Sequence, residues 1–214
     1  MRSLIQNIDI LLYAVIVTLE LVALSLIFSL IIGAIIALLR MSNSNILRIP
    51  AMIFIEVFRN IPSLIQLLWI YYVLPVLFGL SLPPYVSAVM AFALNGGAYT
   101  AEIFRGGIQS ISKNQWDAAS AIGLNYIMTL KKIIIPQAIR RMIPPLMNEF
   151  IRLTKSTSLV SVIAISDILY RVSELSSETF LPLEFYTAGG ILYYIIITPV
   201  AHLALRMEKR TAIA

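Results

Sequence analysis

Cysteine is absent from the 214 residues, and histidine occurs only once, at His202. Without cysteine the chain can form no disulfide, no thiolate nucleophile and no cysteine-ligated metal site. One histidine cannot hold a metal ion alone, and we interpret His202 as a polar side chain near the end of an apolar segment. The sequence therefore predicts neither a metal site nor a cofactor.

Charged residues are also scarce. They make up 13% of the chain, whereas hydrophobic residues make up 59%. Soluble domains have roughly a quarter of their residues charged, so this composition excludes an ordinary soluble domain. The net charge of +5 would suggest nucleic acid as a partner of a soluble protein. In so apolar a chain it is better explained by basic cytoplasmic loops of a membrane protein, and we expect no nucleic-acid partner.

A phosphate-binding loop is missing as well. None of the nine glycines begins a GxxxxGK[ST] sequence, the loop that cradles nucleotide phosphates. The chain therefore has no recognisable nucleotide site, and any energy that it uses must come from another chain.

Five apolar runs fill most of the sequence, each near or above the ~20 residues that a membrane-spanning helix needs. No small-residue cleavage site follows the first run, which is too long for a signal-peptide core, so we expect it to be retained. Glu56, Arg59 and Pro62 interrupt the second run. We predict an all-α polytopic membrane protein with five transmembrane helices and a single domain, 1–214. The runs are 10–39, 50–80, 85–104, 143–170 and 185–205.

The loop charges predict the orientation, because basic residues concentrate on the cytoplasmic side of a membrane protein. With five spans and a cytoplasmic carboxy terminus, only Arg2 and Arg171 lie outside among the basic residues that flank the spans. The opposite orientation would reverse this bias. The residues that the predicted orientation places in the cytoplasm are Arg40, Arg48, Arg105, Lys113, Lys131, Lys132, Arg140, Arg141, Arg206, Lys209 and Arg210.

The longest polar interruption, 102–136, lies between the third and fourth runs. Its pattern predicts two short helices, 114–122 and 125–135, joined by a tight bend at Gly123 and closed by Pro136. A bent segment of this kind has no backbone partners in lipid, so it must project into water. It is a candidate docking surface for another protein.

A motif occupies this polar stretch. Asp117-Ala118-Ala119 is followed after three residues by Gly123, and nine residues later by Ile133-x-Ile135-Pro136. The pattern resembles the EAA signature, E-A-A-x3-G-x9-I-x-L-P, of binding-protein-dependent ABC importer permeases, with Asp for Glu and Ile for Leu. The alanines allow close packing in a groove, and Gly123 permits a left-handed backbone. The resemblance implies that Asp117, Ala118, Ala119, Gly123 and Pro136 dock on an ATPase.

The resemblance covers about residues 15–210. The segments 55–75, 93–111 and 153–163 are similar to the polar amino acid subfamily of these permeases, although Asn60-Ile61 departs from the usual FRGTP. It implies an ABC type I importer transmembrane fold with a coupling loop at about 105–141, in the inner membrane of a bacterium. The implied partners are two cytoplasmic ATPase subunits, a second permease (identical or paralogous) and an extracytoplasmic amino acid binding protein, besides membrane lipid.

Ionisable residues also lie inside the apolar runs, where they usually face a bundle interior or an aqueous path. Glu56 and Arg59 share a helix face at a spacing of three, and Glu149, Arg152 and Lys155 repeat that spacing. Internal ion pairing would explain them equally simply. A polar stripe along a substrate path suits an amino acid, which carries both signs of charge. Glu149 favours a cationic side chain, and an amide stays open. The predicted path residues are Glu56, Arg59, Glu149, Arg152, Lys155, Ser156 and Thr157.

Two other classes of function compete with an importer permease. An intramembrane enzyme would need a nucleophile with a base, but Ser156 and Ser158 have no histidine on a neighbouring span, so we predict no catalytic residue. An uncoupled channel subunit would have no use for an ATPase-docking motif. Pull-down of an ATPase separates the importer from the channel.

The predicted topology can be tested by labelling, since the chain has no cysteine of its own. Single cysteines at Ser42, Asn114, Glu178 and Thr211 should react differently with an impermeant thiol reagent on intact cells. Only position 178 should be labelled, because the other three positions are cytoplasmic in the predicted orientation. Labelling of position 114 from outside would contradict this topology.

Overall fold

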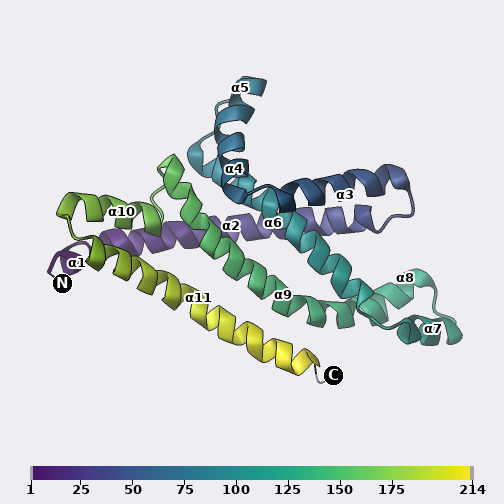
Figure 1. Cartoon of the computed structure of the whole chain (residues 1–214). Helices are drawn as coiled ribbons and strands as arrows, with labels where there is room; N and C mark the ends of the chain where they lie inside the picture. Colours follow the sequence, from purple (N-terminus) through teal and green to yellow (C-terminus); the bar gives the residue numbers. More distant parts are fainter. Residues whose placement is uncertain (1, 213–214) are drawn as a thin grey trace.

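The structure is a computed structural model that describes residues 2–212, with the side chains of residues 3–209. These residues form helices joined by short connections, and no strand occurs among them (Figure 1). The elements are α1 (Arg2–Gln6), α2 (Ile8–Arg40), α3 (Asn45–Asn60), α4 (Ser63–Leu68), η1 (Trp69–Val73), α5 (Leu74–Phe78), α6 (Pro84–Gln109), α7 (Lys113–Ala121), α8 (Tyr126–Thr129), η2 (Leu130–Ile134), α9 (Ile135–Ser156), η3 (Thr157–Ile163), α10 (Ile168–Thr179) and α11 (Pro182–Ala212). The all-α prediction is confirmed.

Within the described residues, two helices, α2 and α11, are each long and apolar enough to cross a membrane. The broken pair of Asn45–Asn60 and Ser63–Phe78 makes a third candidate if it counts as one span. Helices α6 and α9 have 26 and 22 residues, enough for about 39 and 33 Å at ~1.5 Å per residue. Neither helix is apolar enough to be among these candidate spans. Figure 1 shows α7 and α8 at one end of the molecule and α10 at the other.

Helices α2 and α6 pack at very short range, because small residues face each other across the contact. A Cβ atom added to Gly33 of α2 would overlap the hydroxyl of Thr100 on α6 and reach 3.0 Å from the backbone nitrogen of Ala101. The Thr100 hydroxyl donates a hydrogen bond of 2.7 Å to the carbonyl oxygen of Ser29 on α2. Small residues allow this approach in lipid, where helices gain little from hydrophobic burial.

The second predicted span, 50–80, is not one straight helix. The chain turns by 108° between α3 and α4, at Ile61 and Pro62. Two amides support the turn, which frees carbonyl groups at the end of α3. Asn95 of α6 donates 2.8 Å to the carbonyl of Phe58, and Gln66 of α4 donates 2.9 Å to the same oxygen and 2.7 Å to that of Ile61. Without them, these carbonyls would lack partners in an apolar surrounding.

Two π-helical turns, η1 and η2, each precede a proline. Proline has no N–H to donate to the carbonyl four residues earlier, and its ring crowds that carbonyl. The turns widen instead, so that Leu74 donates to Trp69 and Ile135 donates to Leu130, five residues back. The sequence predicted that Pro136 closes the second short helix, and this prediction is wrong. Pro136 lies in the first turn of α9, and α8, η2 and α9 follow each other without a break from Tyr126 to Ser156.

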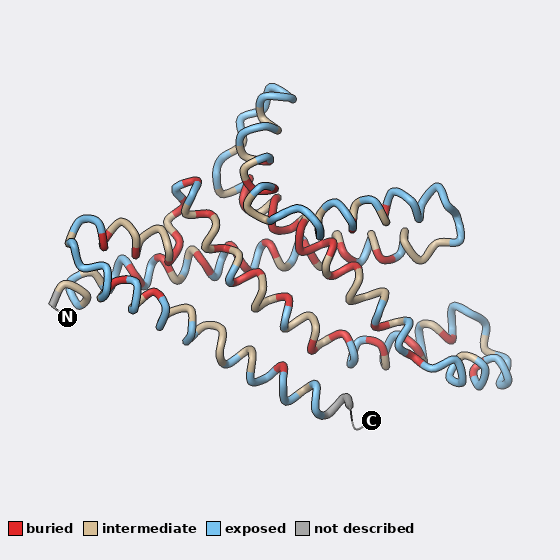
Figure 2. The backbone as a smooth tube through the Cα atoms, in the orientation of Figure 1, coloured by how far each residue is buried: buried red, intermediate tan, exposed pale blue. Residues whose placement is uncertain are grey.

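The fourth predicted span, 143–170, is also wrong at its carboxyl end. Helix α9 ends at Ser156 and continues as the 3₁₀ helix η3 to Ile163. The next residues turn the chain into α10, where Asp167 caps the helix by accepting a hydrogen bond of 2.9 Å from the backbone N–H of Tyr170. Most of the polar and acidic stretch between the fourth and fifth predicted spans, 171–184, belongs to α10. The buried positions concentrate where α2, α6 and α9 meet (Figure 2).

The close α2–α6 contact predicts opposite effects for two glycine substitutions. Gly33→Ala should lower the unfolding temperature of the detergent-solubilised protein, because its methyl group has no room beside Thr100. Gly190→Ala is the matched control, since a Cβ on this glycine of α11 would meet nothing within 4 Å. There the helix propensity of alanine should give a neutral or slightly raised unfolding temperature. Equal effects of the two substitutions would contradict close α2–α6 packing.

Candidate functional site

A buried ion pair lies at the centre of the helix assembly. Arg152 contacts both carboxylate oxygens of Glu149, with a distance of 2.7 Å in each hydrogen bond. Glu149 is only 4% exposed, whereas Arg152 is half-buried. The two residues lie on α9 at a spacing of three, so they meet on one helix face. Gly96 of α6 makes room for the pair, because a Cβ there would lie 3.3 Å from Oε1 of Glu149.

Tyr99 joins this ion pair to a third helix. The guanidinium carbon of Arg152 lies 4.2 Å from the centroid of the Tyr99 ring, and that of Arg59 lies 5.3 Å from it. Cations within about 6 Å of an aromatic centroid are attracted by the ring. The structure therefore brings together α3, α6 and α9 at one polar cluster, which we call the arginine–tyrosine cluster: Arg59, Tyr99, Glu149 and Arg152.

The remaining predicted path residues are less closely involved. The side chains of Glu56 and Lys155 are exposed and form no hydrogen bond or ion pair with the residues that the structure describes. The hydroxyls of Ser156 and Thr157 donate to the backbone carbonyls of Arg152 and Thr154, at 3.0 and 2.7 Å. Tyr99 was not among the predicted residues, because its only signal in the sequence is its place beside Asn95-Gly96-Gly97 in an apolar run.

A second group of charges lies nearer to the α7–α8 end. Glu102 of α6 pairs with Arg40 at the end of α2 at 3.0 Å and with Arg105 of its own helix at 2.7 Å. Arg59 is also near enough to act electrostatically on Glu102. These charges connect the ends of α2 and α6 and continue the polar side of α6 from Tyr99 onward.

The candidate docking element has the predicted local geometry. Helix α7 ends at Ala121, and Gly123 follows with φ of +78°, in the left-handed region that the motif requires. Across this bend the rings of Trp116 and Tyr126 stack with centroids 5.5 Å apart. The side chain of Asn125 caps α8 by accepting a hydrogen bond of 2.9 Å from the backbone N–H of Met128. The ring stack and the Asn125 cap thus both stabilise the bend.

The predicted docking residues differ in their exposure to the surface. Ala119 is 1% exposed and packs inward, whereas Asp117, Ala118 and Pro136 are exposed. Two large apolar side chains of this element, Ile122 and Ile127, are 74% and 71% exposed. Exposed apolar side chains on a polar segment make it a candidate contact surface.

Among the described residues, no group of three His, Cys, Asp or Glu side chains lies close enough together to hold a metal ion. His202 lies exposed on α11, with its Nδ1 3.1 Å from the carbonyl oxygen of Thr198. Its position agrees with a polar side chain near the end of a span.

Comparison with known proteins gives consistent matches. Residues 29–212 match the family model described as "Binding-protein-dependent transport system inner membrane component". The L-cystine transport system permease protein TcyB of Bacillus subtilis is 41% identical over 180 residues, which are 84% of this chain and 76% of that protein. The glutamine transport system permease protein GlnP of Escherichia coli K12 is 36% identical over 197 residues, 92% and 90% of the two chains. A crystal structure of an amino acid ABC transporter with histidines superposes with a TM-score of 0.91 at 34% identity, over 97% of both chains.

Proposed function

The chain belongs to the family of binding-protein-dependent transport system inner membrane components, and from that premise we propose that it imports a polar amino acid. Family membership identifies it as an inner-membrane transport subunit of a bacterial ABC transporter rather than an enzyme. It also implies an ATPase and a substrate-binding protein as partners. Neither an intramembrane enzyme nor an uncoupled channel is favoured by any of the relatives.

The arginine–tyrosine cluster is the observation that supports a path for an amino acid. It offers the carboxylate of Glu149 and the cations Arg59 and Arg152, joined by one aromatic ring. An amino acid has an ammonium and a carboxylate, which these groups match in sign. Similar chains are named for glutamine and cystine, and the solved transporter was crystallised with histidines. We assign a polar amino acid as the substrate, with a cationic or amide side chain.

The ion pair of Glu149 and Arg152 allows the carboxylate to exchange its partner when a substrate enters the path. A buried carboxylate without a partner is costly, so Glu149 keeps Arg152 as its partner while no substrate is present. A substrate ammonium would replace that partner, and the released guanidinium would remain over Tyr99. Lys155 and Glu56, which are exposed, would contribute to the path from its rim.

The connection from the docking element to the cluster supports coupling to ATP hydrolysis. We propose that α7 and α8 dock on the ATPase through the exposed Asp117 and Ala118 and the bend at Gly123, while the buried Ala119 packs against its own chain. Because α8, η2 and α9 are continuous, a displacement of α8 reaches Glu149 through one helical rod of about 35 Å, at ~1.5 Å per residue. Pro136 and η2 lie within this rod, between the docking element and the cluster.

The stretch from α4 to α5 supports a dimer of permeases. It projects away from the other helices in Figure 1 and is mostly exposed in Figure 2. Three of its apolar side chains, Val76, Phe78 and Leu77, are 82%, 67% and 63% exposed. A second permease, identical or paralogous, would cover them. We place the amino terminus outside and the carboxy terminus in the cytoplasm, so that two ATPase subunits meet the two docking elements.

Coupling is tested by Gly123→Val. No atom lies within 4 Å of an added Cβ, so the substitution acts through the left-handed backbone and not through a clash. Forcing a β-branched residue into φ of +78° should cost about 1–2 kcal/mol and shift the bend. We expect normal membrane levels, weaker association with the ATPase and loss of ATP-driven uptake in membrane vesicles.

The matched control for this change is Gly106→Val, where an added Cβ also meets nothing within 4 Å but the backbone is helical. This variant should keep its uptake. Normal transport by Gly123→Val would show that the α7–α8 bend does not carry the coupling.

The substrate path is tested by Glu149→Gln, which keeps the shape of the side chain and removes its charge. If Glu149 binds the substrate ammonium, a hydrogen bond to a charged group worth about 1.5–3 kcal/mol is weakened. The half-saturation concentration for uptake should then rise by roughly ten- to hundredfold, with assembly preserved. Uptake is measured beside the ATPase activity that the loaded binding protein stimulates.

A purely structural ion pair gives the opposite pattern. Glu149→Gln would then lower the amount or the unfolding temperature of the protein, while transport per molecule stayed unchanged. That outcome would assign Glu149 to the helix packing instead of the path.

A further inference from the structure

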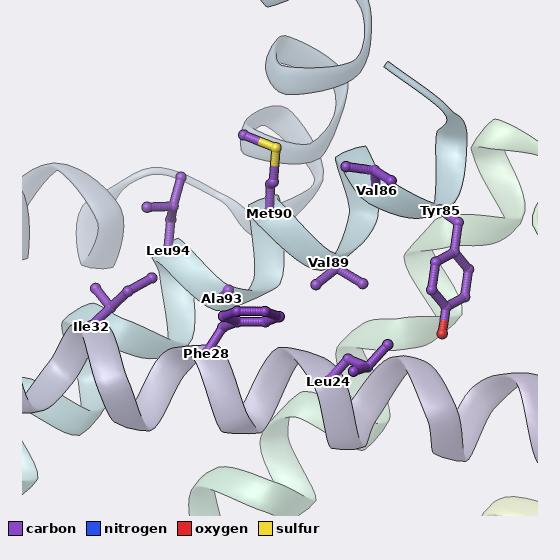
Figure 3. Close-up of a pocket in the computed structure, with 9 residues that line it drawn as sticks. All are labelled: Leu24, Phe28, Ile32, Tyr85, Val86, Val89, Met90, Ala93 and Leu94. Carbon is purple, nitrogen blue, oxygen red and sulfur yellow. The ribbon is translucent and has the colours of Figure 1, made fainter.

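An apolar groove runs between α2 and α6, and no charged residue lines it (Figure 3). Its volume is about 400 Å³, within the ~300–1,000 Å³ of pockets that hold small ligands. Every lining residue is hydrophobic, and only the Tyr85 hydroxyl adds a polar atom. The lining residues are Leu24, Phe28, Ile32, Tyr85, Val86, Val89, Met90, Ala93 and Leu94.

One end of the groove has a polar mouth. Tyr85 lies there, one residue into α6, with its hydroxyl at the tip of the side chain in Figure 3. Glu20 precedes Leu24 by four residues on α2, so its carboxylate lies one helical turn beyond the lining, on the same helix face. Glu20 and Tyr85 are near enough to interact electrostatically.

The carboxylate of Glu20 needs a partner, and no side chain in the described part of the chain supplies one. Glu20 is exposed, and it makes no hydrogen bond or ion pair among the described side chains. An ionised side chain within a membrane helix is costly unless a cation or water compensates it. The mouth of the groove therefore favours a cationic group, whereas its shaft favours hydrocarbon.

We propose that this groove binds a membrane phospholipid with a primary ammonium headgroup, such as phosphatidylethanolamine. One acyl chain lies along Phe28, Val89 and Leu94, and the ammonium donates hydrogen bonds to the Glu20 carboxylate at the mouth. Hydrogen bonds between ionised partners are stronger than neutral ones, so the headgroup confers selectivity. A choline headgroup has no N–H to donate, and a glycerol headgroup has no cation.

The lining supports a lipid chain over a protein segment as the occupant. A peptide segment would bring backbone N–H and C=O groups against a wall without hydrogen-bond partners, which costs free energy unless the segment is helical. An acyl chain has no such groups. Leu24, Phe28 and Val86 at the rim are 39%, 48% and 43% exposed, so the groove is open to the surrounding membrane.

The test measures which lipids the purified full chain retains. The chain is equilibrated in mixed micelles of phosphatidylethanolamine, phosphatidylcholine and phosphatidylglycerol in equal amounts, with identical acyl chains, and bound lipids are counted by native mass spectrometry. We expect about one phosphatidylethanolamine per chain, preferred roughly tenfold over the other two lipids, which equals about 1.4 kcal/mol. Glu20→Gln should keep a bound lipid and lose this preference.

Two tryptophan substitutions separate the groove from general lipid contact. Val86→Trp adds bulk at the rim and should reduce retained lipid at least tenfold. Ile27→Trp, at a somewhat more exposed position of α2 outside the groove, should leave it unchanged. Equal retention by both variants, or no headgroup preference in the unmodified chain, would overturn the proposal. A Val86→Cys variant that forms a disulfide with another copy in native membranes would also overturn it, since a second permease would then cover the groove.

Discussion

The close contact of α2 with α6 is the constraint on which the other features of the structure depend. Gly33, Ser29 and Thr100 bring the two backbones so near that a single added methyl group has no room. Helix α6 is thereby fixed, and its other faces carry the contacts that shape the rest of the molecule. Asn95 supports the turn between α3 and α4, Gly96 makes room for Glu149, and Tyr99 meets two arginines.

Many polar groups in this assembly find partners within the protein, because lipid offers them none. Asn95 and Gln66 take the carbonyls freed by the α3–α4 turn, and Arg152 takes both oxygens of Glu149. A group whose partner is fixed within the chain can stabilise the fold, while one that remains exposed, such as Glu20 or Lys155, needs water, lipid or another molecule.

Two prolines, Pro75 and Pro136, each follow a π-helical turn without interrupting the helix. Pro136 was predicted to end a helix, but a proline in the first turn of a helix loses no hydrogen bond that the following residues need. The chain before it widens into η2, and the helix continues. This continuity connects α8 to the arginine–tyrosine cluster, and a break at Pro136 would have separated them.

Local properties of the sequence were sufficient for much of this result. Apolar runs indicated helices in a membrane, glycine at position 123 indicated a left-handed bend, and the alanine–glycine spacing indicated the family, because each depends only on neighbouring residues. The tertiary structure alone decided the 108° turn at Ile61 and Pro62, the hydrogen bond from Asn95 to the carbonyl of Phe58, and the place of Tyr99 between Arg59 and Arg152. These depend on side chains from helices far apart in the sequence, and spacing along one helix cannot say which of them meet.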